Sequence, residues 1–191
     1  MQILHISGKL QILSKSLLWL LKRKHMIIRE MSKADIAEVY SLRMITRENT
    51  LTREELEKLG ITENSVSGML RTSHRGWVCV ESERMVGFAI GNHILGEMWV
   101  IAIHPDFEEK GIGKALITYV QDWLWEKGWD KIWLTTDIDT TLRAYGFYKK
   151  LGWEDQEIKD GMRYMQLVNP KQKRHNKALH EERVKDTRPV S

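Results

Sequence analysis

The sequence predicts an α+β fold, in which helices flank a mixed and mostly antiparallel sheet. Apolar runs of strand length and helical apolar stripes follow one another in the order βαα, βββ, α, β, α, ββ, which differs from the strict alternation of a parallel α/β protein. The three strands in the middle are joined by short turns, and short turns connect antiparallel neighbours. At 191 residues of near-average composition, the chain has room for one such domain.

The first part of the predicted domain holds one strand and a helical region. Residues 26–30, MIIRE, are short and apolar, as a strand requires. Ser32 is placed as the N-cap of a helix over residues 32–45, where apolar side chains recur at helical spacing. Two further helix starts follow, at Thr52 and at Thr62, each with a residue three positions later that can complete a capping box.

Three strands are predicted next, over residues 76–82, 85–93 and 97–105. The third is apolar on both faces after Glu97, which predicts a strand buried in the middle of the sheet. The single cysteine, Cys79, lies in the first of these strands without a partner and is interpreted as a core residue. A disulfide framework is thereby excluded, and we expect a reducing, cytoplasmic location.

The last part of the domain returns to helices and ends in a hairpin. A regular apolar stripe predicts a helix that begins at Ile112 and stops at Gly128. The elements after it are a strand, a helix and two strands around a turn at Asp160, and they cover residues 131–137, 140–152 and 153–167.

The two ends of the chain differ in charge from the domain between them. Residues 1–25 carry five basic and no acidic residues, and residues 170–191 carry seven basic and three acidic ones. Since the whole chain has a net charge of +4, residues 26–169 carry a net charge of −5. This acidic body does not support a general nucleic-acid-binding face. The first segment has no apolar run long enough to span a membrane and is either an amphipathic surface helix or a marginally ordered extension. The last segment is predicted to be a disordered tail.

Gly111 and Gly113 lie between the strand predicted over residues 97–105 and the helix that follows it. Backbone N–H groups at such a helix N-terminus favour a phosphate. A P-loop requires a hydroxyl residue after its lysine, but Lys114 is followed by Ala115. A dinucleotide-binding turn requires a third glycine where Leu116 stands. Neither of these two phosphate-binding devices fits.

The segment EEKGIG, residues 108–113, resembles the pyrophosphate loop of the GNAT acyltransferases, which reads Gln or Arg, two residues, Gly, one residue, Gly or Ala. AIHPDF before it and AYGFYKKLGW after it are similar to further segments of that family, and the resemblance covers residues 26–169. It implies the GNAT fold, whose fourth and fifth strands splay apart to admit coenzyme A. LTTDIDTTLRAYGFYKKLGW and RENTLT resemble a bacterial subgroup whose members mostly lack a defined substrate. Glu108 departs from the motif, because a carboxylate repels a pyrophosphate unless it points away.

The resemblance implies an N-acetyltransferase that moves acetyl from acetyl-CoA to a primary amine by direct attack in a ternary complex. The N–H of Ile103 is the expected oxyanion donor. Thr141 stands where many relatives have an asparagine that contacts the cofactor, and its hydroxyl can still donate one bond. The expected cofactor-binding residues are Ile103, Glu108, Lys110, Gly111, Ile112, Gly113, Lys114, Thr141 and Ala144.

Tyr148 is the expected proton donor to the departing thiolate, with Tyr145 as the alternative. Glu97 is the expected base, acting directly or through water, although a carboxylate at an exposed strand end is an open alternative. The expected acceptor-binding residues, which can equally be solvated or packed residues, are Arg47, Glu48, Asn49 and Trp99. No histidine and carboxylate cluster at metal spacing occurs, so no metal is expected.

The acceptor stays open at this level. A small polyamine, an aminoglycoside or an amino-acid derivative suits an acidic body, and a protein lysine or N-terminus suits it nearly as well. Two rival functions are a tRNA-directed acetyltransferase toxin, with the basic ends as phosphate contacts, and a non-catalytic sensor or scaffold that binds acyl-CoA. Nucleic acid is not an expected partner of the body, and homodimers are common in the family.

Overall fold

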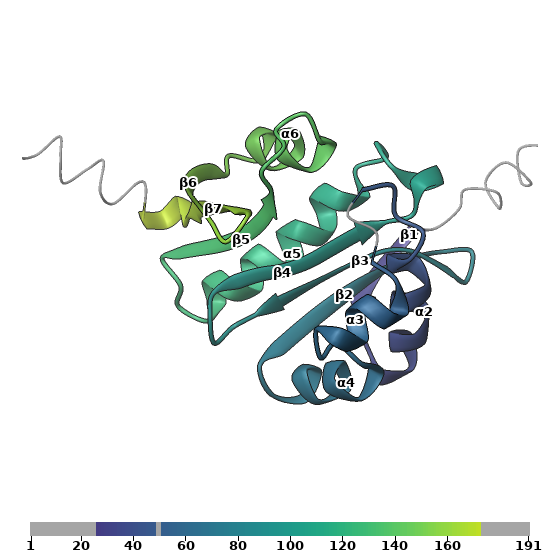
Figure 1. Cartoon of the computed structure of the whole chain (residues 1–191). Coiled ribbons are helices and arrows are strands. Elements are labelled where there is room, and N and C mark those ends of the chain that lie inside the picture. Colours follow the sequence, from purple (N-terminus) through teal and green to yellow (C-terminus); the bar gives the residue numbers. More distant parts are fainter. Residues whose placement is uncertain (1–25, 49–50, 173–191) are drawn as a thin grey trace, which may run out of the picture.

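The computed structural model describes residues 26–48 and 51–172 (Figure 1). Its seven strands are β1 (Met26–Glu30), β2 (His74–Glu81), β3 (Arg84–Asn92), β4 (Glu97–Ile103), β5 (Lys131–Asp137), β6 (Glu154–Lys159) and β7 (Met162–Val168). They form one sheet in the order β1-β2-β3-β4-β5-β7-β6. Only β4 and β5 pair in parallel, and every other neighbouring pair is antiparallel. The predicted α+β class with a mixed, mostly antiparallel sheet is confirmed.

The helices of the described residues follow the predicted order, with small shifts at their starts. The helix predicted from Ser32 begins as a single 3-10 turn, because the Asp35 carboxylate accepts from the Ser32 N–H and hydroxyl and tightens the chain there. The helix predicted from residue 140 begins at Arg143, because Asp139 accepts both the N–H and the hydroxyl proton of Thr141 in a turn. The helical elements are η1 (Lys33–Asp35), α2 (Ile36–Arg43), α3 (Arg53–Lys58), α4 (Glu63–Thr72), η2 (Pro105–Phe107), α5 (Ile112–Glu126) and α6 (Arg143–Lys150).

Two capping boxes define α3 and α4, as the sequence predicted. The Thr52 hydroxyl accepts from the Glu55 N–H at 3.2 Å, and the Glu55 carboxylate accepts from the Thr52 N–H at 2.7 Å. Thr62 and Ser65 repeat the arrangement at the start of α4. Each box satisfies two backbone donors that the first helical turn leaves without an intrahelical acceptor, so both helix starts are fixed locally.

Helices cover both faces of the sheet (Figure 1). α5 packs across β2, β3 and β4 on one face, α2 and α4 pack on the other, and α6 packs against β5. Cys79 is 1% exposed in the core beneath α5, which confirms it as a core residue. Burial raises the pKa of its thiol, which disfavours the reactive thiolate.

β4 is the central strand of the sheet, as its apolar faces predicted. It pairs with β5 only where Glu97 lies opposite Trp133, and the Trp133 N–H donates to the Gly96 carbonyl at 3.0 Å. The ladder between β3 and β4 shifts by one residue beside Trp99, which marks a bulge. The parallel pair is therefore joined at one end, and this matches the splayed strands that the family resemblance implied.

The segments at the two ends lie mostly outside the description. Pro170 begins a helical turn whose cap is Asn169, since the Lys171 N–H donates to the Asn169 side chain at 3.0 Å. Residues 1–25 and 173–191 lie outside the described residues, so the proposed extension and tail stay predictions. Within residues 26–48 and 51–172, no helix has both the length and the apolar character to cross a membrane.

Candidate functional site

The glycine turn opens α5 with its backbone donors exposed. Gly111 is the N-cap in a left-handed conformation (φ 81°), and a β carbon there would meet no atom within 4 Å. The Ala115 N–H donates to the Gly111 carbonyl, so the N–H groups of Ile112, Gly113 and Lys114 precede the first intrahelical bond and have no acceptor within the helix. The first turn of α5 carries no acidic residue. The helix start therefore offers space, donors and a positive dipole end to an anion.

α6 packs directly across this helix start. A β carbon on Gly113 would lie 3.3 Å from the ring of Phe147 and 3.7 Å from the side chain of Ile103 on β4. The distance to Phe147 is tight, so a larger residue would require that ring to move slightly, whereas the distance to Ile103 is an ordinary van der Waals contact. Gly113 therefore lets α5, α6 and β4 approach one another where the family resemblance places the cofactor phosphates.

Glu108, the departure from the family motif, is bound by two arginines. Arg143 Nη1 lies 2.5 Å from Glu108 Oε2, and Arg47 Nη1 lies 3.4 Å from the same oxygen. The Glu108 side chain is only 11% exposed. The carboxylate is thus directed at guanidinium groups from α6 and from the loop after α2, and its negative charge is compensated locally.

Glu48 caps the start of α6 from a distant part of the sequence. Its carboxylate accepts from the N–H of Arg143 at 3.1 Å and from the N–H of Ala144 at 3.3 Å. Arg47 and Glu48 therefore connect the loop after α2 to α6 and Glu108. Their expected place beside the acceptor stays a prediction. Asn49, the third loop residue of that prediction, lies outside the described residues.

Three further predicted cofactor contacts are partly engaged within the protein. The Thr141 hydroxyl donates its proton to Asp139 at 2.7 Å, so in this conformation it offers no free donor. Lys110 Nζ donates to the Asp106 carbonyl at 2.8 Å and lies over the Phe107 ring. Lys114 is exposed on the first turn of α5. All three residues are exposed, and Lys114 is the one that lies on the first turn of α5 itself.

β4 presents an open edge that leads away from the glycine turn. The His104 N–H donates to Val86 on β3 at 2.9 Å. Backbone groups alternate in direction along an antiparallel strand, so those of Ile103 and Ile101 point toward β5. Beyond Glu97, the described part of β4 has no ladder partner in β5. An extended ligand can pair with such an edge as an added strand.

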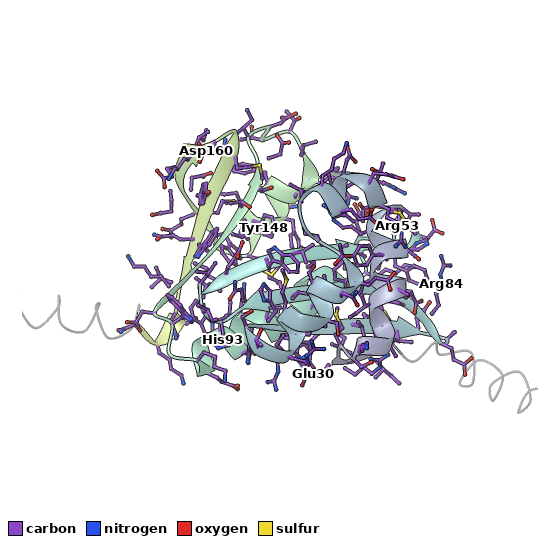
Figure 2. All side chains as sticks on the ribbon, turned by 60° about the horizontal axis from the view of Figure 1, so that its bottom comes forward. Glu30, Arg53, Arg84, His93, Tyr148 and Asp160 are labelled. Atoms are coloured by element: carbon purple, nitrogen blue, oxygen red, sulfur yellow. The ribbon has the colours of Figure 1, made fainter. Side chains whose placement is uncertain are left out.

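Tyr148 lies inside the molecule, between the helices of the first half and the hairpin that carries Asp160 (Figure 2). Burial raises its pKa to about 12, and the positive charge of Arg43 on α2 offsets part of that rise. Arg43 lies on α2, which packs on the face of the sheet opposite to α5. Its interaction with Tyr148 fits a phenol that lies in the gap between β4 and β5. At neutral pH the side chain keeps its proton.

Glu97 begins β4 at the joined end of the parallel pair. Its side chain is partly buried, and burial raises the pKa of the carboxyl. A carboxylate with a raised pKa is a better proton acceptor at neutral pH than an exposed one. The environment of Glu97 thus suits a general base. The side chain is only partly exposed at this strand end.

A cavity of roughly 150 Å³ lies on the α2 face of β3 and β4, next to the bulge. Trp99 lines it, and its expected role in binding the acceptor stays a prediction. The hydroxyl of Tyr40, a residue only 3% exposed, has no hydrogen-bond partner among the described residues. Arg43 also lines the cavity and links it to Tyr148. The lining is otherwise apolar, with Val39, Leu51, Leu56, Ile61, Val66, Phe88, Ile90 and Val100.

The sequence did not reveal Arg43 and Arg143 as members of this site. A signal existed for Arg143, which directly precedes Ala144 at the start of the recognised AYGFYKKLGW segment. Arg43 has no such signal, because only the packing of α2 brings it near Tyr148. Within the two described ranges, no three His, Cys, Asp or Glu side chains gather as a metal site would require.

An open strand edge that leads from an anion-accepting helix start to a buried, protonated tyrosine is the arrangement of an acyl-CoA-dependent transferase. A model of the acetyltransferase (GNAT) family matches residues 36–153, more than half of the chain, and the chain belongs to this family. The recognition made from the glycine turn is thereby confirmed.

Curated relatives are similar over a limited segment. A mycothiol acetyltransferase of Renibacterium salmoninarum is 35% identical over 81 residues, which is 38% of this chain and 24% of that protein. The ribosomal protein bS18-alanine N-acetyltransferase of Escherichia coli K12 is 30% identical over 81 residues, 41% of this chain and 54% of that protein. The match thus spans about a quarter to a half of these relatives.

Solved structures share the fold. The PaiA N-acetyltransferase of Thermoplasma acidophilum, crystallised with coenzyme A, superimposes with a TM-score of 0.66 at 16% identity, over 76% of this chain and 99% of that one. The Escherichia coli ribosomal-protein-S18-alanine N-acetyltransferase gives 0.60 at 20% identity, over 75% of this chain and 94% of that one. Identities this low establish the GNAT fold alone.

Proposed function

We propose that this protein transfers the acetyl group of acetyl-CoA to a primary amine by direct attack in a ternary complex. The open edge of β4, which runs from the glycine turn to the joined end of β4 and β5, carries this proposal. The turn has free backbone donors and open space at Gly111, and the charge of Glu108 is compensated by arginines. These observations fit a bound diphosphate.

Backbone groups of α5 and β4 bind different parts of acetyl-CoA, the acyl donor. The N–H groups of Ile112, Gly113 and Lys114 hold the diphosphate, and the Lys114 side chain adds charge. The backbone of Ile101 and Ile103 pairs with the extended arm, and one of these N–H groups, that of Ile103 in our assignment, donates to the oxyanion. Acetyl-CoA, when bound, supplies an acetyl thioester with a thiol leaving group.

Two side chains move protons in this proposal. Glu97 accepts a proton from the ammonium form of the acceptor, directly or through water, and the neutral amine that results has a nucleophilic lone pair. The amine nitrogen forms its bond to the acetyl carbon and the carbonyl electron pair moves to the oxygen as the oxyanion. When that pair returns, the carbon–sulfur bond breaks, and the nitrogen loses its extra proton. Tyr148 Oη gives its proton to the sulfur, and because burial keeps the phenol neutral, that proton is available at working pH.

The cavity beside the bulge suits the apolar part of an acceptor. Its volume of roughly 150 Å³ matches a phenyl or branched aliphatic group. Tyr40 can hydrogen-bond a polar atom of that group. Arg43 places a positive charge at the cavity, which disfavours a polyamine and favours an amine that carries a carboxylate or carbonyl, as amino-acid derivatives and peptide N-termini do.

A panel of amines with acetyl-CoA, monitored by free thiol and by mass spectrometry of the amine, tests this function. We expect thiol release that depends on the amine, with acetylated product, and a higher kcat/KM for apolar amino-acid amides or short peptides than for spermidine. Thermal stabilisation by acetyl-CoA without thiol release across the panel would favour the sensor or scaffold instead. Preference for spermidine would contradict only the acceptor assignment.

A further inference from the structure

Four charged side chains form one network across the mouth of the gap between β4 and β5. Glu108 precedes the glycine turn, Arg143 begins α6, and Arg47 and Glu48 come from the loop after α2. Glu108 Oε2 is shared by the two arginines, and Glu48 Oε1 lies 3.4 Å from Arg143 Nε. We call these residues the arginine–glutamate network. Its two positive and two negative charges cancel.

Packing fixes Arg143 beside the start of α5. Arg143 and Phe147 are four residues apart on α6 and therefore share a face of that helix. Phe147 lies against Gly113 in the first turn of α5. The Arg143 side chain consequently comes from the same side as the free N–H groups of that turn, and its contact with Glu108 shows that it reaches the turn itself.

Arginine carries five N–H donors in a planar fork, which matches the oxygens of a phosphate. Glu108 engages Nη1 of Arg143, and Glu48 lies near Nε. A carboxylate held by two guanidinium groups occupies a position that also suits a phosphate, with one negative charge where a phosphate group brings more.

We propose that Arg143, assisted by Arg47, binds a phosphate of the acyl donor, and that Glu108 is an internal anion that the phosphate replaces on these arginines. This inference rests on the proposed function. The chain thereby supplies from α6 the positive charge that the family motif carries at position 108. Glu108 holds the two arginines at the turn, but it lowers the affinity for the acyl donor, because its negative charge opposes the incoming phosphate.

Calorimetric titration of coenzyme A into the full chain tests the proposal without requiring turnover. We expect Arg143→Gln to weaken Kd roughly 10- to 100-fold, because a charge-assisted bond to phosphate is lost. Arg143→Lys should lose less, since the charge remains. Glu108→Gln should tighten Kd roughly 3- to 10-fold, because a competing negative charge is removed.

Two comparisons separate this effect from damage to the fold. The exposed side chains of Arg75 on β2 and Glu30 on β1 pair at 3.1 Å, so Arg75→Gln and Glu30→Gln are matched controls and should leave Kd unchanged. Raising the ionic strength should weaken binding less in Arg143→Gln than in the unmodified protein, because fewer charges contribute. A tighter Kd in Glu108→Gln cannot arise from unfolding.

The outcomes are distinguishable. A Kd within twofold of the unmodified protein in Arg143→Gln, or a weaker Kd in Glu108→Gln, would overturn the exchange of Glu108 for phosphate while leaving the proposed function intact. An unmodified protein that does not bind coenzyme A at all would overturn both.

Discussion

The ring of Phe147 lies 3.3 Å from the place that a β carbon on Gly113 would occupy, so α6 rests against the first turn of α5 through a glycine. This contact brings together the glycine turn, the open edge of β4 and the start of α6. Contacts of 3.3 Å are tight, and an added methyl group must displace the ring or the helix.

Gly113→Ala should therefore be less stable than an unhindered glycine-to-alanine change in a helix by about 1 kcal/mol or more, because the Phe147 ring must move by a few tenths of an ångström. Gly146→Ala on α6 is the matched control, because its β carbon would meet nothing within 4 Å and its φ is not positive. It should be neutral or stabilise the protein by up to about 1 kcal/mol. Thermal melts measure both effects, and a Gly113→Ala protein as stable as Gly146→Ala would refute the packing argument.

Tyr148→Phe keeps the buried ring and removes only the hydroxyl. We expect kcat to fall by about 100-fold, because the thiolate then leaves without a positioned proton donor. Steady-state rates across pH measure this loss. Tyr145→Phe is the comparison, since the Tyr145 hydroxyl donates to Asp155 at 3.1 Å on the exposed side and should leave kcat unchanged. Retention of kcat in Tyr148→Phe, with a loss in Tyr145→Phe, would transfer the role to Tyr145.

Glu97→Gln tests the base through the pH profile. Burial raises the pKa of Glu97, so the acidic limb of log kcat/KM should fall at a higher pH than for an exposed glutamate. In the variant this limb should disappear and kcat/KM at neutral pH should drop by about 100-fold. An acidic limb that persists in Glu97→Gln would exclude this carboxylate as the base.

Asp35 should make the fold acid-sensitive. Its hydrogen bonds from Arg29, and further bonds from Ser32, lower the pKa of the carboxyl to about 2. A depressed carboxyl pKa stabilises the folded state above the unfolded pKa of about 3.9, and this contribution is lost as pH falls toward 2. We expect a loss of about 1 to 2 kcal/mol, reduced by the exposure of Arg29.

Denaturation at several pH values measures this loss. Asp35→Asn should be less stable at neutral pH and should flatten the decline between pH 4 and 2, whereas Asp122→Asn on the exposed side of α5 should change neither. An Asp35→Asn protein with the same acid-induced decline as the unmodified protein would show that other groups cause it.

Local patterns were sufficient to predict most of the fold. The capping boxes at Thr52 and Thr62 and the β5 boundaries follow from residues within a few positions of each element. The glycine turn could also be predicted from the sequence, because glycine is the residue that suits the φ of 81° at Gly111. The start of α6 was misjudged by three residues because Asp139 binds Thr141 in a turn, a side-chain preference that competes with the helix.

The long-range contacts of the site could not be predicted in this way. Glu48 caps α6 from 95 residues away, and Arg143 meets Glu108 across 35 residues. Periodicity and spacing carry no information on such pairs, since they arise only when α2, α5 and α6 pack on one sheet. The contacts of Arg47 with Glu108 and of Glu48 with Arg143 were therefore not foreseen, and the expected role of both residues beside the acceptor stays a prediction.

The central claim is acyl transfer to an amine, and the most direct test is the stoichiometry of a single reaction with acetyl-CoA and the best amine of the panel. Free thiol and acetylated amine are quantified in the same sample. The account predicts that they appear in a one-to-one ratio and that omitting the amine stops thiol release. Thiol release that continues without an amine, or that yields no acetylated amine, would contradict it.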